Sequence, residues 1–223
     1  MPPSPTQTNW KLLRRAFFNR DPRQVGQELL GKLIVRRQGR KVLAGRIVEV
    51  EAYLGATDLG PKDLAAHAAA GRTARNSVVF GPPGHAYIYF IYGVHYCLNI
   101  SCLPDGEAGC VLIRALEPVA GLGAMAQARD LSDLDLDDLN HSSTRDLRKL
   151  TSGPGRLCEA LTITRPHDNG KDMVAPRSDL QVMEDGFRLK EDQIAVTPRI
   201  GITKSAEMPL RYVIAGNAFV SGK

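Results

Sequence analysis

The sequence predicts a single α+β domain built around a mainly antiparallel β-sheet. Short runs rich in β-branched and aromatic residues are separated by turn residues, as in hairpin-connected strands. Shorter segments with helical periodicity stand before and after these runs. The 223 residues contain neither an internal repeat nor a clear linker, and a chain of this length suits one hydrophobic core.

A flexible start and a first helix are expected at the N-terminal end. Residues 1–20 are rich in proline, serine, threonine and basic side chains, and we expect them to attach loosely to one domain spanning residues 21–223. Asp21 is suited to cap a helix, Pro22 to occupy its first turn and Gly31 to end it. The sequence therefore predicts a helix from Pro22 to about Gly31.

Eight strands and three further helices complete the expected fold. The strands are predicted at 32–37, 41–53, 87–92, 95–102, 109–118, 180–183, 194–196 and 211–213. The helices are predicted at 120–131, 144–150 and 153–161. Residues 55–84 are rich in Gly, Pro and Ala, with at most one helical turn at 64–69, and loops this long are usually functional or disordered. The acidic stretch 130–138 is expected to be an exposed loop.

The charge of the chain favours a polyanionic partner. Its 29 lysines and arginines exceed its 24 acidic residues, giving a net charge of +5, and a basic surface attracts nucleic acid through Coulomb forces and counterion release. Basic side chains gather in two predicted loops: Arg36, Arg37, Arg40 and Lys41 around a turn, and Arg72 with Arg75 in the long segment. For either group alone, a solvated loop is an equally good interpretation.

No cofactor or metal is expected. Cys97, Cys102, Cys110 and Cys158 form no Cys-x-x-Cys pair, and the five histidines are scattered rather than set at zinc-ligand spacing. Buried free thiols are the preferred interpretation of the four cysteines.

No membrane or export segment is expected either. No apolar run approaches the roughly 20 residues that span a bilayer, and the first residues lack the pattern of a signal peptide. We expect a monomer without a signal peptide that is intracellular, in the cytoplasm or at the nucleoid if the source is bacterial.

One carboxylate is distinguished by its position. Ile47, Glu49, Glu51 and Tyr53 share one face of the predicted strand 41–53, because strand side chains alternate. Glu51 lies near the end of this strand, beside the long irregular segment, where a carboxylate on a rigid strand can serve as a general base. For an arbitrary glutamate, however, a structural salt bridge with an arginine is the better interpretation.

A cluster of tyrosines points in the same direction. Tyr87, Tyr89 and Tyr92 precede a glycine that suits a hairpin tip or bulge, and aromatic faces near a positive surface stack on nucleobases. As a bare hairpin such a run more often packs in a core. Asn99 and Arg114 on the next two strands could place polar groups beside the same surface. Phosphate-loop, nucleophile-elbow, zinc-helix and deaminase motifs are missing, so these residues alone indicate a candidate nucleic-acid enzyme.

Several motifs in order resemble those of the alkyladenine (3-methyladenine) DNA glycosylase family. They are RIVEVEAYLG at 46–55, AAH at 65–67, ARN at 74–76, YIYFIYGVHYCLNIS at 87–101, VLIRALEP at 111–118, SGPGRLC at 152–158 and PRIG at 198–201. The resemblance runs from about Asp21 to the C-terminus and is weakest across 130–143. It implies a curved antiparallel sheet flanked by helices, with a protruding β-hairpin that enters the DNA minor groove.

The resemblance also implies roles for individual residues. Tyr92 resembles the hairpin-tip residue that intercalates where a nucleotide has been flipped out, and Arg72 and Arg75 are expected to bind DNA. Tyr53, His67 and Tyr89 resemble the walls of the base pocket, to which His67 also offers its backbone amide. Asn99 resembles the residue that obstructs the 2-amino group of guanine.

Glu51 resembles the water-activating base of that family, and Arg114 the residue that helps to position it. The implied enzyme is a monofunctional DNA glycosylase of base excision repair, whose partner is double-stranded DNA containing alkylated or deaminated purines. The order of preference among 3-methyladenine, 7-methylguanine, hypoxanthine and ethenoadenine stays open, as does the general acid for neutral bases. The alternatives are a nucleic-acid-binding module without turnover, which retention of Glu51 and Arg114 disfavours, and an enzyme acting on free nucleosides, which the hairpin and basic loops disfavour.

Overall fold

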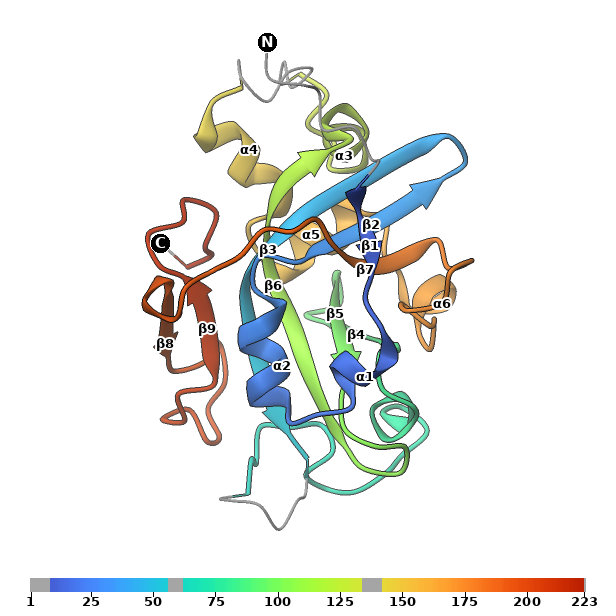
Figure 1. Ribbon diagram of the computed structural model, residues 1–223, viewed down its shortest axis with the longest axis vertical. Helices are drawn as coiled ribbons and strands as arrows, with labels where there is room; N and C mark the ends of the chain where they lie inside the picture. The colour runs from blue at the N-terminus through green and yellow to red at the C-terminus, as the bar shows by residue number, and fades with distance from the viewer. Residues whose placement is uncertain (1–8, 56–61, 134–141, 223) are drawn as a thin grey trace.

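Nine strands form one sheet in the part of the chain that the structure, a computed structural model, describes: residues 9–55, 62–133 and 142–222 (Figure 1). They are β1 (Lys11–Leu12), β2 (Leu33–Gln38), β3 (Lys41–Leu54), β4 (Ala86–Ile91), β5 (His95–Ser101), β6 (Gly109–Ala120), β7 (Leu180–Glu184), β8 (Ile194–Thr197) and β9 (Arg211–Ile214). Their order is β1-β7-β2-β3-β6-β5-β4, while β9 pairs with both β3 and β8. All these pairings are antiparallel, so the predicted mainly antiparallel sheet is confirmed.

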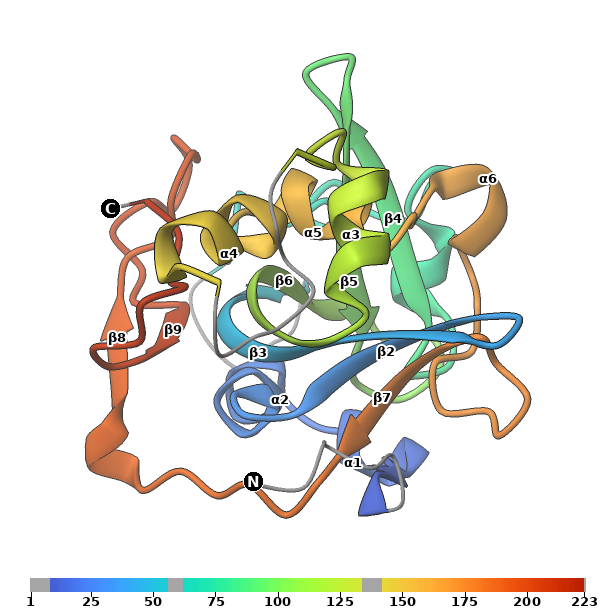
Figure 2. The same cartoon turned by 90° about the horizontal axis from the view of Figure 1, so that it is seen from above.

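Short helices pack against this sheet. They are α1 (Arg15–Phe18), α2 (Pro22–Leu29), α3 (Leu122–Ala128), α4 (Thr144–Thr151), α5 (Pro154–Ala160) and α6 (Arg165–Asp168), with the 3-10 helices η2 (Ser77–Phe80) and η3 (Glu191–Gln193). Seen from above, α3, α4 and α5 lie on one side of β3, and α2 lies on the other (Figure 2). Apolar side chains of both groups join the main core. The predicted helices at 120–131, 144–150 and 153–161 are therefore present, with shifted ends.

The start of α2 follows the predicted chemistry. The Asp21 carboxylate accepts a hydrogen bond from the backbone N–H of Arg23 at 2.8 Å, and Pro22 opens the helix. Val25 and Leu29 are fully buried. Gly31, just beyond the helix, has a φ of +82°, which glycine adopts without strain.

Strand β3 connects the two halves of the sheet. It pairs with β6 from Ala44 to Leu54, with β2 near its start, and with β9 at residues 49–51. Its register against β6 shifts between Ile47 and Glu49 and again after Glu49. Such bulges bend a strand. Ile47, which precedes them, packs in the main core.

Two expectations about the chain change. Residues 11–18 fall within the segment predicted to be flexible, yet β1 pairs with β7 and Phe18 is fully buried; residues 1–8 lie outside the described residues. The grouping of Arg36 with exposed loop residues is wrong. Strand β2 is paired on both edges and α6 closes over it, so Arg36 is buried, with ion pairs to Asp168 at 2.7 Å and Asp179 at 3.0 Å.

The long irregular segment largely keeps its predicted character. Within its described part, turns at 64–70 precede the 3-10 helix η2. Glycine, proline and alanine are all disfavoured in β-strands. Residues 56–61 and 134–141 lie outside the described residues, and the second range includes most of the acidic stretch 130–138. None of the helices in the described ranges combines the length and apolar character that crossing a membrane requires.

Candidate active site

Strand register brings the predicted site residues onto one face of the sheet. Tyr53 lies opposite Cys110 across β3 and β6, and Asn99 lies opposite Tyr87 across β5 and β4. Tyr89 shares the face of Tyr87 because it is two residues further along β4. Residues that are separated along the chain therefore meet at the C-terminal end of β3.

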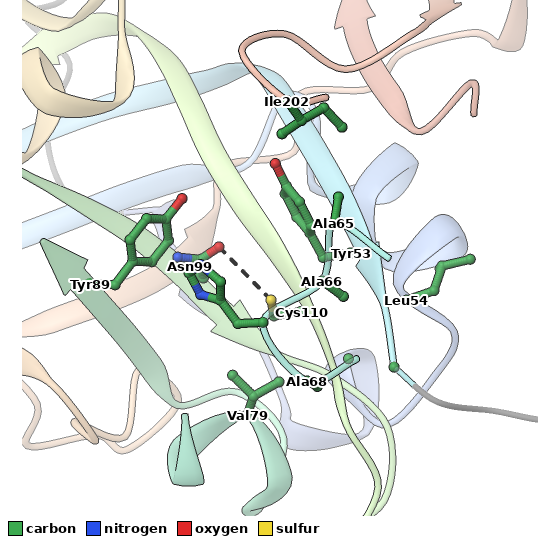
Figure 3. A pocket seen from close by; sticks show the side chains of 13 residues that line it. Tyr53, Leu54, Ala65, Ala66, Ala68, Val79, Tyr89, Asn99, Cys110 and Ile202 are labelled. Carbon is green, nitrogen blue, oxygen red and sulfur yellow. Dashed lines mark hydrogen bonds between the residues drawn. The ribbon is translucent and has the colours of Figure 1, made fainter. Parts of the chain in front are cut away.

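These side chains line a pocket between the sheet and the segment that follows β3. The space inside it that a water-sized sphere can occupy is about 90 Å³. Tyr53 and Tyr89 lie on opposite sides of it in Figure 3, with Asn99 between them at the level of the sheet. The full lining is Tyr53, Leu54, Gly55, Ala65, Ala66, His67, Ala68, Val79, Tyr89, Asn99, Gly109, Cys110 and Ile202.

Glu51 lies next to the pocket wall without lining the pocket. Its side chain has no exposed surface. One carboxylate oxygen, Oε2, accepts a hydrogen bond from the Tyr53 hydroxyl at 2.9 Å. The other, Oε1, accepts one from the backbone N–H of Ile200 at 2.8 Å and is 3.1 Å from Nη1 of Arg114. Burial, followed by the negative charge of Glu51, raises the pKa of Tyr53, so the phenol remains a hydrogen-bond donor at neutral pH.

Arg114 joins Glu51 to a second buried carboxylate on the same strand. Its Nε donates to Oε1 of Glu49 at 2.9 Å. Burial alone lowers the pKa of an arginine, but the charges of Glu51 and Glu49 outweigh this effect, so the pKa of Arg114 is raised. Glu49 is also bound by Arg211 at 2.7 Å and by the backbone N–H of Ser221 at 2.6 Å.

His67 forms another wall and is held from two sides. Its Nδ1 lies 2.8 Å from the Tyr87 hydroxyl, and its ring meets that of Tyr89 edge to face with centroids 4.6 Å apart. The amide of Asn76 donates to the His67 carbonyl at 2.9 Å. Burial, and secondarily the nearby charge of Arg75, lowers the pKa of His67, so the imidazole is neutral at pH 7.

Asn99 is oriented by its neighbours on the sheet. Its Nδ2 donates to the carbonyl of Tyr87 at 3.2 Å, and the Cys110 thiol lies 3.9 Å from its Oδ1. The amide oxygen therefore points toward the side of the pocket where Cys110 lies (Figure 3). Burial raises the pKa of Cys110 to about 12, so this thiol stays protonated.

The remaining predicted residues lie outside the pocket. Tyr92 is 83% exposed at the tip of the β4–β5 hairpin, which projects from the body of the protein in Figure 2. Its φ of +53° and that of Gly93, +70°, make the tight turn. Arg72 and Arg75 are exposed on the segment that follows His67.

Sequence reasoning missed a buried ion pair behind the pocket wall. Arg199 donates to both carboxylate oxygens of Asp63 at 2.7 Å, and its guanidinium lies 4.6 Å from the ring centroid of Tyr53. The PRIG motif contains this arginine, but strand alternation predicts nothing for a residue in a loop. Cys110 was interpreted only as a buried thiol, although its position opposite Tyr53 follows from antiparallel pairing.

The cysteine prediction is confirmed, since all four side chains are free and buried. Among the described residues, no group of three or more His, Cys, Asp or Glu side chains is arranged to hold a metal ion.

Comparison with known proteins agrees with the motifs. The model of the methylpurine-DNA glycosylase family matches residues 16–218. A protein of Koribacter versatilis is 62% identical over 95% of this chain and 93% of its own length. Proteins of Burkholderia cenocepacia and Methanoculleus marisnigri are 44% and 42% identical, over 98% and 94% of this chain and 96% and 98% of their own lengths. All three carry the name "Putative 3-methyladenine DNA glycosylase". The resemblance seen in the sequence is thereby confirmed, and the chain belongs to the methylpurine-DNA glycosylase family of DNA-repair hydrolases.

Proposed function

We propose that this protein flips an alkylated or deaminated purine out of duplex DNA and hydrolyses its N-glycosidic bond, leaving an abasic site. The observation that carries the proposal is the fully buried Glu51 carboxylate, hydrogen-bonded to the tyrosine that walls an aromatic pocket. A carboxylate hydrogen-bonded to the wall of a cavity lies one side chain away from what the cavity binds.

The pocket is suited to a flat base. Tyr53 and Tyr89 would stack on its two faces, and His67 would close one edge. Alkylation at N3 or N7 makes a purine cationic, and a cation over a tyrosine ring gains about 0.5–2 kcal/mol. The fixed amide of Asn99 would obstruct the 2-amino group of an undamaged guanine.

Glu51 would supply the chemistry. Cleavage of an N-glycosidic bond passes through an oxocarbenium-like sugar, which a carboxylate stabilises while it takes a proton from the attacking water. A carboxylate offers about four acceptor positions. The Tyr53 hydroxyl, the Ile200 N–H and Arg114 use three of them. One position on Oε2 is left, and because Glu51 has no exposed surface, entry of the flipped nucleotide would have to open that position to the water.

A hydrolytic rather than a lyase reaction fits the pocket. Schiff-base chemistry requires an amine beside the sugar, and no lysine belongs to the described lining of the pocket. A cationic base is already a good leaving group, so the pocket needs no strong acid for alkylated purines.

The exposed residues would hold the DNA. Tyr92 would wedge into the gap left by the flipped nucleotide, offsetting part of the few kcal/mol of lost stacking. Arg72 and Arg75 would bind phosphates of the DNA backbone.

The test is single-turnover excision from duplexes that each carry 3-methyladenine, 7-methylguanine, hypoxanthine or ethenoadenine. We expect free base and an intact strand with an abasic site from at least one of them. Glu51→Gln, measured in parallel, should still bind the best substrate without excising it. A wild-type protein that excises none of the four bases would refute the proposal.

A further inference from the structure

We infer that Arg199 is a positioning residue for excision: with Asp63 it fixes both the tyrosine wall of the pocket and the carboxylate of Glu51. This inference rests on the proposed function. Arg199 contacts neither the pocket nor the reacting atoms, but it contacts the groups that hold them.

Arg199 connects the three segments that build the site. Its side chain and that of Asp63 have no exposed surface, and they form a two-point ion pair. Arg199 also donates to the carbonyl of Ala52 on β3 at 3.0 Å. Asp63 accepts hydrogen bonds from the backbone N–H groups of Leu54 and Ala65 at 3.0 and 3.1 Å. One pair thus links the end of β3, the segment leading to His67 and the loop that begins at residue 198.

The carboxylate of Glu51 is held by groups that adjoin Arg199. In the described part of the chain, three groups contact this carboxylate, and two of them lie next to Arg199. The Ile200 N–H belongs to the next residue along the chain. The hydroxyl of Tyr53 belongs to the ring against which the guanidinium lies. Because Arg199 does not line the pocket, this ring separates the guanidinium from the base that Tyr53 would stack on.

Stability alone does not account for the pair. Replacing a buried ion pair with well-packed apolar residues is often neutral or stabilising, so burial of this pair is weak evidence that it serves stability. Arg199 also leaves its Nε without an acceptor in the described part of the chain, and an unsatisfied buried donor costs about 1–3 kcal/mol. We therefore assign the pair to the geometry of the site.

The chain provides a matched control. Arg36 and Asp168 form a second buried Arg–Asp pair at 2.7 Å, and Arg36 also donates to a backbone carbonyl, that of Leu161. None of these residues lines the pocket. Arg36→Lys should therefore affect stability as Arg199→Lys does while leaving excision by the folded protein unchanged.

The experiment compares Arg199→Lys with Arg36→Lys. Lysine keeps the charge but loses the planar two-point pairing and the stacking on Tyr53. The readouts are thermal unfolding, affinity for an undamaged duplex, and the maximal single-turnover excision rate per folded molecule on the best lesion duplex. We expect both variants to lose stability and to bind undamaged DNA as the wild type does. Only Arg199→Lys should lose about tenfold to a hundredfold in the excision rate.

Excision by Arg199→Lys within about twofold of the control would overturn the inference. If Arg199→Lys does not fold, Asp63→Asn with Arg199→Gln removes the pair without leaving a lone charge and is judged by the same rate. Loss of folding in this double variant too would assign the pair to stability and overturn the inference as well. Failure of the proposed function is a different result, since there the wild type itself would excise none of the four bases.

Discussion

Glu49 and Glu51 are two carboxylates on the same strand, two residues apart, with the same burial and a shared partner. Both side chains are fully buried, and both form ion pairs with Arg114. Their other contacts differ. Glu49 is bound by Arg211 and by the backbone of Ser221 near the C-terminus. Glu51 is bound by the hydroxyl of Tyr53, which lines the pocket.

Under the proposed function, burial and ion pairing do not distinguish the catalytic carboxylate from its neighbour. The two residues are equally buried, and Glu49 forms ion pairs with both Arg114 and Arg211 whereas Glu51 pairs with Arg114. Contact with a cavity wall distinguishes them. We assign Glu49 to holding Arg114 and the C-terminal segment, and Glu51 to the reaction. Each of the following predictions tests that division.

The largest effect is expected from Glu51→Gln. The amide keeps the size of the side chain but cannot take a proton from water, and general-base catalysis contributes about 10²–10⁴-fold. The maximal excision rate should fall by that factor while the affinity for lesion DNA persists, as measured by single-turnover kinetics and a binding titration. An excision rate within about tenfold of the wild type would remove the distinction between the two glutamates.

Glu49→Gln should act on stability instead. The change removes the charge that pairs with Arg114 and with the partly buried Arg211, while Arg114 keeps its ion pair with Glu51. Breaking a buried ion pair by removing one partner costs about 3–5 kcal/mol. We expect the free energy of unfolding in urea to fall by about that amount. An unchanged unfolding midpoint would show that Glu49 does not hold this region together.

Tyr53→Phe tests the hydrogen bond to Tyr53 that Glu51 has and Glu49 lacks. It removes the hydroxyl that binds Glu51 but keeps the stacking ring. Hydrogen bonds to charged groups are worth about 1.5–3 kcal/mol, so the excision rate should fall by about tenfold or more. Tyr89→Phe is the control, because it changes the opposite wall of the same pocket away from Glu51. Equal losses in the two variants would argue that the hydroxyl acts through the pocket surface rather than through Glu51.

The smallest effect should come from residues remote from both glutamates. Arg72→Gln with Arg75→Gln removes two exposed positive charges without touching the pocket lining. The logarithm of the affinity falls with the logarithm of the salt concentration, and each lost phosphate contact makes this slope shallower by about 0.9. We expect a shallower slope and weaker binding, with an unchanged excision rate for bound DNA. A slope equal to that of the wild type would exclude these arginines from the DNA contact.

Much of the fold could be predicted because its patterns are local. The cap at Asp21 and Pro22 acts within a few residues and appears in the structure. Alternation along β3 holds from Glu49 to Tyr53, but the register shifts on either side of Glu49 interrupt it, and Ile47 packs in the main core instead of sharing that face. The prediction for Arg36 failed because the burial of that side chain depends on α6, more than 120 residues away along the chain. Residues 11–18 similarly acquire structure only by pairing with β7.

The candidate site likewise has a part that strand patterns predict and a part that depends on tertiary contacts. Tyr53, Tyr89 and Asn99 share a pocket because strand pairing and alternation place them together, and both rules operate on sequence. The contacts of Arg199 with Asp63 and Tyr53 join two loops to β3. Loop conformations follow from tertiary contacts rather than from periodicity, so no pattern in the chain indicates this pair.

The most direct test of the account is the ratio of two rates: maximal single-turnover excision by Glu49→Gln and by Glu51→Gln, each per folded molecule on the same lesion duplex. The account predicts that Glu49→Gln retains activity to within about tenfold of the wild type, while Glu51→Gln loses about a hundredfold or more. Equal losses in the two variants, or a greater loss from Glu49→Gln, would contradict it.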